Sequence, residues 1–250
     1  MAPLTTHLVI GERVFAQLSQ LDPVDYGGFL LGNVLVDVHV FGDVERRTTH
    51  FAERLAGDGP LAFHRSCANF LSQLDGLLAR PWDALTSAER AFVAGYLCHL
   101  AADEDWKQFD WDTLHTQGIY LWTDLPVPGD VILTAFDVLS SELYVDFPSV
   151  ASALRDVAVP DLWTHVPYGI FQAMWETFQA HFLDHSTLES YFETERRLGK
   201  TGAEVEELRH QHEVYWEDAV QLIQTTFGGI QSRVQAMVQH SLKTMPRLWR

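Results

Sequence analysis

A histidine and an aspartate stand four residues apart inside one long apolar stretch, and this pair constrains the fold more than any other feature. Residues 91–106 read AFVAGYLCHLAADEDW, which places His99 and Asp103 on the helix face that also carries Phe92 and Tyr96. A buried ionised carboxylate is unfavourable unless a cation or strong donors meet it. Imidazole and carboxylate are common zinc ligands, so the stretch predicts a metal site within a helical protein. A hydrogen-bonded pair within the helix is the alternative.

The apolar periodicity of the remaining chain is also helical. A first helix capped by Thr5 or Thr6 is expected to reach residue 18, and further helices are predicted over 61–78, 86–106, 130–145, 150–157 and 165–198. Residues 203–242 form one helix or two, with a possible break at Gly228 and Gly229. Alternation typical of a strand is rare, and residues 35–40 are the best short strand. The sequence therefore predicts a single all-α domain over 1–250, built as a multi-helix bundle.

Net charge is the skewed part of the composition, because 34 acidic residues against 17 basic ones give −17. A chain this acidic repels nucleic acid and anionic membranes, so no nucleic-acid binding is expected. The sequence has no secretory signal pattern and no apolar run long enough for a transmembrane segment, so we expect a cytoplasmic protein. Cys67 and Cys98 make no disulfide framework and suit small buried positions.

Three further polar side chains stand where the surrounding pattern is apolar. His7 precedes an apolar run in the first helix, Asp37 ends the run FLLGNVLV, and His50 follows Arg-Arg-Thr-Thr. With His99 and Asp103 they give three imidazoles and two carboxylates from four segments. Helical bundles assemble buried metal sites in this way, each helix supplying one or two ligands. The mixture of nitrogen and oxygen donors suits zinc or iron better than calcium.

The order and local context of these residues resemble the bacterial zinc-dependent phospholipase C family. The matching motifs are Thr-Thr-His7-Leu, FLLGNVLV followed by Asp37, Arg-Thr-Thr-His50-Phe, and GYLCHLAAD. The last motif, of the form Gly-Tyr-Leu-x-His-Leu-x-x-Asp, is the most specific. The resemblance covers residues 4–106, so 1–106 would form a metal-site half and 107–250 a divergent helical half. It implies an all-α bundle like that of zinc-dependent phospholipase C and P1-type nuclease.

By this resemblance Asp37, His50, His99 and Asp103 bind one zinc ion, and His7 helps to bind another. The resemblance implies between one and three zinc ions, or another transition metal, and hydrolysis of a small-molecule or lipid phosphoester. Asp37 takes the place of the residue proposed as general base in that family. The metal in such enzymes activates water and neutralises the charge of the phosphate.

The remaining ligands of the family are displaced in this sequence. Valine replaces the usual proline before Asp37, and the next histidine after Asp103 is His115, later than the family pattern. The other possible ligands share one face of a predicted helix much further along the chain: His181, His185 and Glu189. This stripe either rebuilds a second metal site or is a solvated face.

Two functions remain open on these observations. The first is a metal-dependent hydrolase, similar to phospholipase C, that uses metal-activated water. The second is a non-catalytic helical protein with a structural or vestigial metal site, whose C-terminal half binds a partner. Displacement of the second ligand group favours the latter, whereas the matching order of the first group favours the former.

Overall fold

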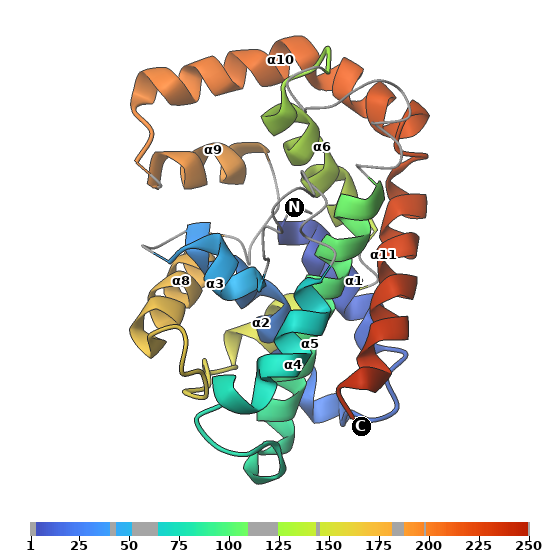
Figure 1. Ribbon diagram of the computed structural model, residues 1–250. Helices are drawn as coiled ribbons and strands as arrows, with labels where there is room; N and C mark the ends of the chain where they lie inside the picture. The colour runs from blue at the N-terminus through green and yellow to red at the C-terminus, as the bar shows by residue number, and fades with distance from the viewer. Residues whose placement is uncertain are drawn as a thin grey trace, which may run out of the picture.

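The computed structural model describes residues 4–40, 44–51, 65–109, 125–143, 146–181, 188–197 and 199–249, and this part of the chain is helical (Figure 1). The α-helices are α1 (Leu4–Phe15), α2 (Tyr26–Leu35), α3 (Arg46–His50), α4 (Ser66–Leu77), α5 (Ser87–Phe109), α6 (Gly129–Ser141), α7 (Phe147–Arg155), α8 (Tyr168–His181), α9 (Leu188–Arg197), α10 (Gly202–Thr225) and α11 (Ile230–Thr244). Pairing of extended backbone within the described ranges is limited to an isolated bridge between Leu78 and Trp163. The prediction of an all-α protein is confirmed.

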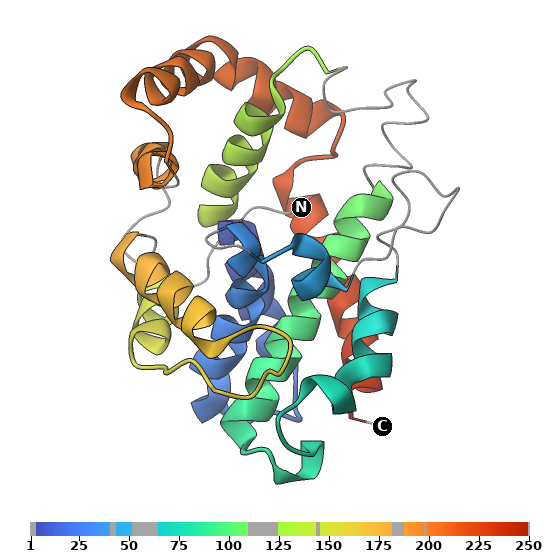
Figure 2. The ribbon, with the colours of Figure 1, turned by 60° about the vertical axis from the view of Figure 1, so that its left-hand side comes forward.

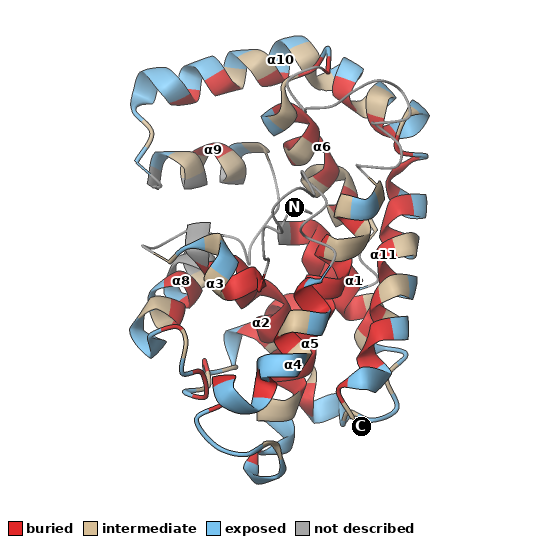
Figure 3. Cartoon of the chain, in the orientation of Figure 1, coloured by how far each residue is buried: buried red, intermediate tan, exposed pale blue. Residues whose placement is uncertain are grey.

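Helix α5 occupies the centre of the molecule, packed against α1, α2, α4 and α11. Its residues 91–103 are all buried, as the apolar pattern predicts. Buried positions gather where these helices meet, while α10 keeps a long exposed face at the far end (Figure 3). In both ribbon views α9 and α10 lie at the end of the molecule opposite the connection between α4 and α5 (Figures 1 and 2). The two halves of the sequence share one apolar core, whose members run from Leu8 to Leu248.

The start of α1 is held by another helix and not by its own threonines. The helix begins at Leu4, so Thr5 and Thr6 lie inside it, and the prediction that either one caps it is wrong. Instead, Asp137 of α6 accepts hydrogen bonds from the backbone nitrogens of Thr5 at 2.6 Å and Thr6 at 3.1 Å. A carboxylate suits this position because the first N–H groups of a helix have no partner within it. The contact fixes the turn that carries His7 against α6.

Residues 35–40 do not form the predicted strand. Leu35 ends α2, and the chain continues as a 3-10 helix over Val36–Val40. Residues 36–38 are all buried, so their side chains do not alternate between a buried face and an exposed face as they would in a surface strand. Within it, Asp37 has φ −80° and ψ 15°, a local departure from helical backbone that turns the chain at a candidate ligand.

The predicted helix over residues 165–198 is also wrong as a single element. Helix α8 begins only at Tyr168, after Pro167, and ends at His181, while α9 is a separate helix in a different direction (Figure 1). A proline disfavours helical backbone at the residue before it, which accounts for the late start. The alternatives for residues 203–242 resolve into two helices, α10 and α11. Gly228 and Gly229 separate them with φ angles of 71° and 83°.

No helix in the described part of the chain has the length and apolarity needed to cross a membrane. Both cysteines are buried and are not joined in a disulfide.

Candidate metal centre

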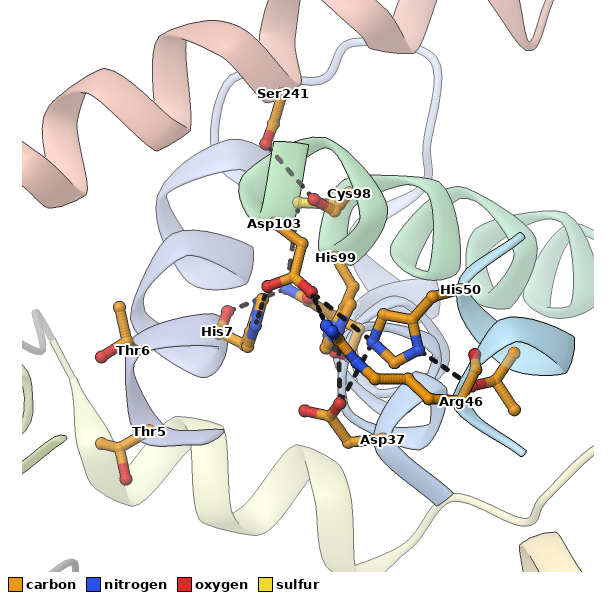
Figure 4. A network of polar contacts seen from close by, with 12 residues as sticks. Thr5, Thr6, His7, Asp37, Arg46, His50, Cys98, His99, Asp103 and Ser241 are labelled. Carbon is orange, nitrogen blue, oxygen red and sulfur yellow. Dashed lines mark hydrogen bonds and ion pairs between the residues drawn. The ribbon is translucent and has the colours of Figure 1, made fainter. Parts of the chain in front are cut away.

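Five titratable side chains from four elements meet inside the molecule (Figure 4). They are His7 of α1, Asp37 of the 3-10 segment, His50 of α3, and His99 and Asp103 of α5. The three imidazoles are at most 1% exposed, and the two aspartates are each 5% exposed. The structure thus brings together five of the ligands predicted from the sequence, although up to 96 positions separate them along the chain.

The donor atoms face one another at short range. His50 Nε2 lies 3.3 Å from Asp37 Oδ1 and 3.5 Å from Asp103 Oδ2. His99 Nε2 lies 3.8 Å from Asp37 Oδ1, and His7 Nε2 lies 3.5 Å from Asp103 Oδ1. The cluster contains two overlapping groups that share His99, one with His7 and Asp103 and one with Asp37 and His50. In each group the ligand atoms lie within 4.8 Å of one another.

These separations fit a bound cation. In a tetrahedral zinc site with bonds of roughly 2.0–2.2 Å, neighbouring ligand atoms lie roughly 3.3–3.6 Å apart. The four nitrogen–oxygen distances, from 3.3 to 3.8 Å, are close to that range and longer than most N–H···O hydrogen bonds, which measure about 2.7–3.2 Å. Both ring nitrogens of His7 and Nε2 of His99 are buried and make no hydrogen bond to the described residues. Buried polar atoms normally have partners, so these nitrogens are suited to bind a metal ion.

His99 is oriented by a backbone carbonyl. Its Nδ1 donates to the oxygen of Asn33 at 2.8 Å, which leaves the lone pair on Nε2, the atom that faces Asp37. The carbonyl can come this close because α2 and α5 pack through glycines. A Cβ atom added at Gly32 would lie 1.9 Å from the oxygen of Phe92, and one at Gly95 would lie 1.9 Å from the oxygen of Phe29. Glycine at these two positions therefore sets the orientation of a candidate ligand.

Asn33 also ties α1 to the same site. Its side-chain Nδ2 donates to the backbone oxygen of His7 at 2.9 Å, and the residue is fully buried. The ring of His7 stacks on that of His99, with centroids 3.7 Å apart and planes 12° apart. One residue of α2 thus holds two histidines through its main chain and its side chain.

His50 has an orienting partner of its own. Thr49 Oγ1 donates to the oxygen of Arg46 at 3.2 Å, so it accepts from His50 Nδ1 at 2.9 Å, and Nε2 faces the carboxylates. Tyr96 of α5 donates its hydroxyl to the oxygen of Thr49 at 2.5 Å, fixing α3 to the core. Phe51 then ends α3 in the left-handed conformation, with φ 53°. Such backbone strain in a non-glycine residue beside a cluster of this kind is typical of functional sites.

Replacing Thr49 with valine is expected to weaken metal binding by about 10- to 100-fold, because His50 loses the acceptor that orients its ring. Competition with a chromogenic chelator measures the affinity. Thr48→Val, one residue earlier in α3, is the matched control and is expected to bind metal as the parent does. Equal affinities for the two variants would show that the Thr49 hydroxyl does not orient His50.

The electrostatics of the cluster keep the carboxylates charged and the central imidazole neutral. Burial by itself raises the pKa of an aspartate, but the neighbouring His99 and His50 lower the pKa of Asp37 below its ordinary value. Asp103 behaves alike: contacts with His7 and Arg46 outweigh burial and lower its pKa. Burial lowers the pKa of His99 to about 3. Anionic carboxylates and neutral imidazoles are the forms that ligate a metal.

Of the other predicted ligands, Glu189 is the one whose side chain the structure places, and it lies outside this cluster. Glu189 is exposed on α9, and its carboxylate forms two hydrogen bonds with the guanidinium of Arg209, of 2.8 and 2.9 Å. His181 is the last residue of α8, so it and Glu189 do not share a helix, and the predicted stripe on one helix face is wrong. Helix α8 ends at His181, and α9 is a separate helix that begins at Leu188. Two predicted ligands lie outside the described residues: His115 and His185.

Sequence reasoning missed the residues that support the ligands. Asn33 stands inside an apolar run, where an amide must be buried and therefore needs a hydrogen-bonding partner, and it is fully buried in the structure. Arg46 was not singled out, yet its Nη2 lies 2.7 Å from Asp103 Oδ2. Its spacing of four residues before His50, which places both on one helix face, was the available signal.

Comparisons with known proteins give no match: no family model fits the chain, and no curated protein or solved structure is similar to it. The geometry and chemistry of the cluster are therefore the basis for assigning a function.

Proposed function

We propose that this protein is a metal-dependent hydrolase of phosphoesters. Asp37, His50, His99 and Asp103 would hold a zinc ion or another transition metal, with His7 adjoining. The observation that carries the proposal is the buried convergence of three imidazoles and two carboxylates at separations of 3.3–3.8 Å. If these residues were hydrogen-bonded to one another without a cation, their nitrogen and oxygen atoms would lie closer together.

A bound metal of this kind supplies an activated water near neutral pH and offsets the negative charge of a phosphate. The side chains of the cluster would have different roles. His50 and His99 present Nε2 lone pairs because Thr49 and Asn33 engage their Nδ1 atoms. Asp37 is our choice for the general base, since it takes the place of the residue proposed for that role in the family that the sequence resembles, and its side chain is 8% exposed.

The resemblance to zinc-dependent phospholipase C supports a phosphodiester as the substrate class. The order and local context of the four motifs resemble that family, and we extend the proposal to its fold. Because Glu189 is hydrogen-bonded to Arg209, it is not a metal ligand here. We therefore propose a centre of one or two ions, smaller than the full set of the family. A phospholipid and a water-soluble phosphodiester share the chemistry that the site would act on.

The test is turnover of two phosphodiesters, bis(p-nitrophenyl) phosphate and a short-chain phosphatidylcholine, together with elemental analysis of the purified chain. We expect bound zinc near one equivalent and turnover that is lost with a chelator and restored by metal. Preference between the two substrates separates a lipid enzyme from one acting on soluble esters. Metal without turnover would contradict the hydrolase and favour the non-catalytic alternative with a structural metal site.

Asp37→Asn is expected to lower turnover by about 100-fold or more per bound metal, because an amide cannot accept the proton. Rates must be normalised to metal content, since Asp37 would also be a ligand. Asp218→Asn, an exposed change on α10, is the control and should retain the parent rate. A normalised rate within about twofold of the parent for Asp37→Asn would remove Asp37 from the role of base.

A further inference from the structure

Arg46 is more exposed than the cluster residues beside it. Its side chain is 26% exposed, against 7% for Asp103 and 8% for Asp37. The imidazole side chains of the cluster are at most 2% exposed. In the close view the guanidinium lies beside the carboxylate of Asp103, and a dashed line joins the two (Figure 4). A molecule entering from solvent would therefore meet Arg46 before the histidines.

The local sequence aims this side chain inward. Arg46 is the first residue of α3 and His50 the last, four positions later, so both lie on the face turned to the site. Nη2 of Arg46 lies 2.7 Å from Asp103 Oδ2. Arg47, the next residue, is turned outward, with 75% of its side chain exposed and an ion pair to Glu45. Two adjacent arginines thus have different environments, which gives a natural matched pair for an experiment.

An anionic ligand needs such a cation in this protein. The net charge of −17 repels phosphate, and the cluster itself holds two carboxylates. A guanidinium presents several N–H donors in a planar fork that matches two phosphate oxygens, and it stays charged at any working pH. The contact of Nη2 with Asp103, at 2.7 Å, holds the guanidinium beside the cluster.

We propose that Arg46 is a phosphate-binding residue, which receives the anionic oxygens of a phosphoester at the solvent-facing edge of the metal centre. This role rests on the proposed function, since it names how that same site recognises its substrate class. Both a lipid headgroup and a free phosphoester carry the required oxygens. Arg46 contributes recognition, and its contact with Asp103 in the ligand-free protein keeps the guanidinium oriented.

The test measures binding of inorganic phosphate to the zinc-loaded full chain by calorimetry, with metal content determined on the same samples. Arg46→Gln is expected to bind phosphate about 10- to 100-fold more weakly, the range of a charge-assisted hydrogen bond. Arg46→Lys keeps a charge beside Asp103 but loses the fork, and we expect it to retain zinc and bind phosphate about 3- to 10-fold more weakly. Arg47→Gln is the control and should match the parent within about twofold.

The proposal would be overturned if Arg46→Lys bound phosphate as the parent does and Arg46→Gln lost its zinc. That result would show that the guanidinium only holds Asp103. Absence of phosphate binding in the zinc-loaded parent would overturn it as well. Phosphate binding that depends on Arg46, without turnover of any phosphodiester, would uphold Arg46 while the hydrolase fails. With active enzyme, a rise in KM for soluble ester and short-chain lipid alike assigns Arg46 to the shared phosphate group, and a rise for lipid alone assigns it to the headgroup.

Discussion

Replacing His99 with alanine is expected to remove most of the bound metal and to lower the stability of the fold. His99 belongs to both overlapping ligand groups, so its loss leaves neither intact. It also leaves Asp37 and Asp103 as buried carboxylates with fewer compensating partners, and breaking a buried ionic arrangement in this way costs about 3–5 kcal/mol. Elemental analysis of the purified variant measures the metal, and urea unfolding measures the free energy.

His210→Ala is the matched control for that experiment. His210 is exposed on α10 and belongs to neither ligand group of the described residues, so metal content and unfolding free energy should stay at the parent values. A second comparison separates packing from metal loss, because chelator should lower the stability of the parent and leave His99→Ala unchanged. Metal at the parent level in His99→Ala would exclude the assigned centre.

The candidate site was predictable because its ligands leave a local trace. His99 and Asp103 interrupt an apolar helix pattern at a spacing of four, and Asp37 ends an apolar run. A polar residue in such a position must have a buried partner, which the sequence reveals without any knowledge of the fold.

The supporting residues were not predictable in the same way, because their roles depend on packing between distant helices. Asp137 holds the start of α1 across more than 130 positions, and no local pattern marks it as a cap. The strand expected over residues 35–40 is wrong, and residues 35–38 are buried on successive positions, so apolar alternation is no guide to structure there. Apolar periodicity continued from α8 toward α9 and concealed the end of α8 at His181. Apart from the segment 35–40, the type of the elements was therefore more predictable than their boundaries.

Gly95→Ala is expected to destabilise the fold by about 3 kcal/mol or more, since the new methyl group collides with backbone rather than with a flexible side chain. Its Cβ would lie 1.9 Å from the oxygen of Phe29 and 2.9 Å from the nitrogen of Asn33. Helix α2 must move away from α5 to admit it. Such a movement lengthens the bond between the Asn33 oxygen and His99 Nδ1, now 2.8 Å, so metal affinity should fall along with stability.

Two other glycines make this a graded series measured by thermal and urea unfolding. At Gly28 an added Cβ would lie 3.0 Å from the oxygen of Ala88, so Gly28→Ala should cause a smaller loss than Gly95→Ala and should fold well enough to measure. At Gly76 of α4 nothing lies within 4 Å, and alanine there should stabilise the protein by about 0.5–1 kcal/mol through helix propensity. If Gly95→Ala instead matched Gly76→Ala in stability and metal affinity, α2 and α5 would not be in backbone contact. The orientation of His99 by Asn33 would then lose its basis, because that carbonyl reaches the imidazole only when the two helices touch.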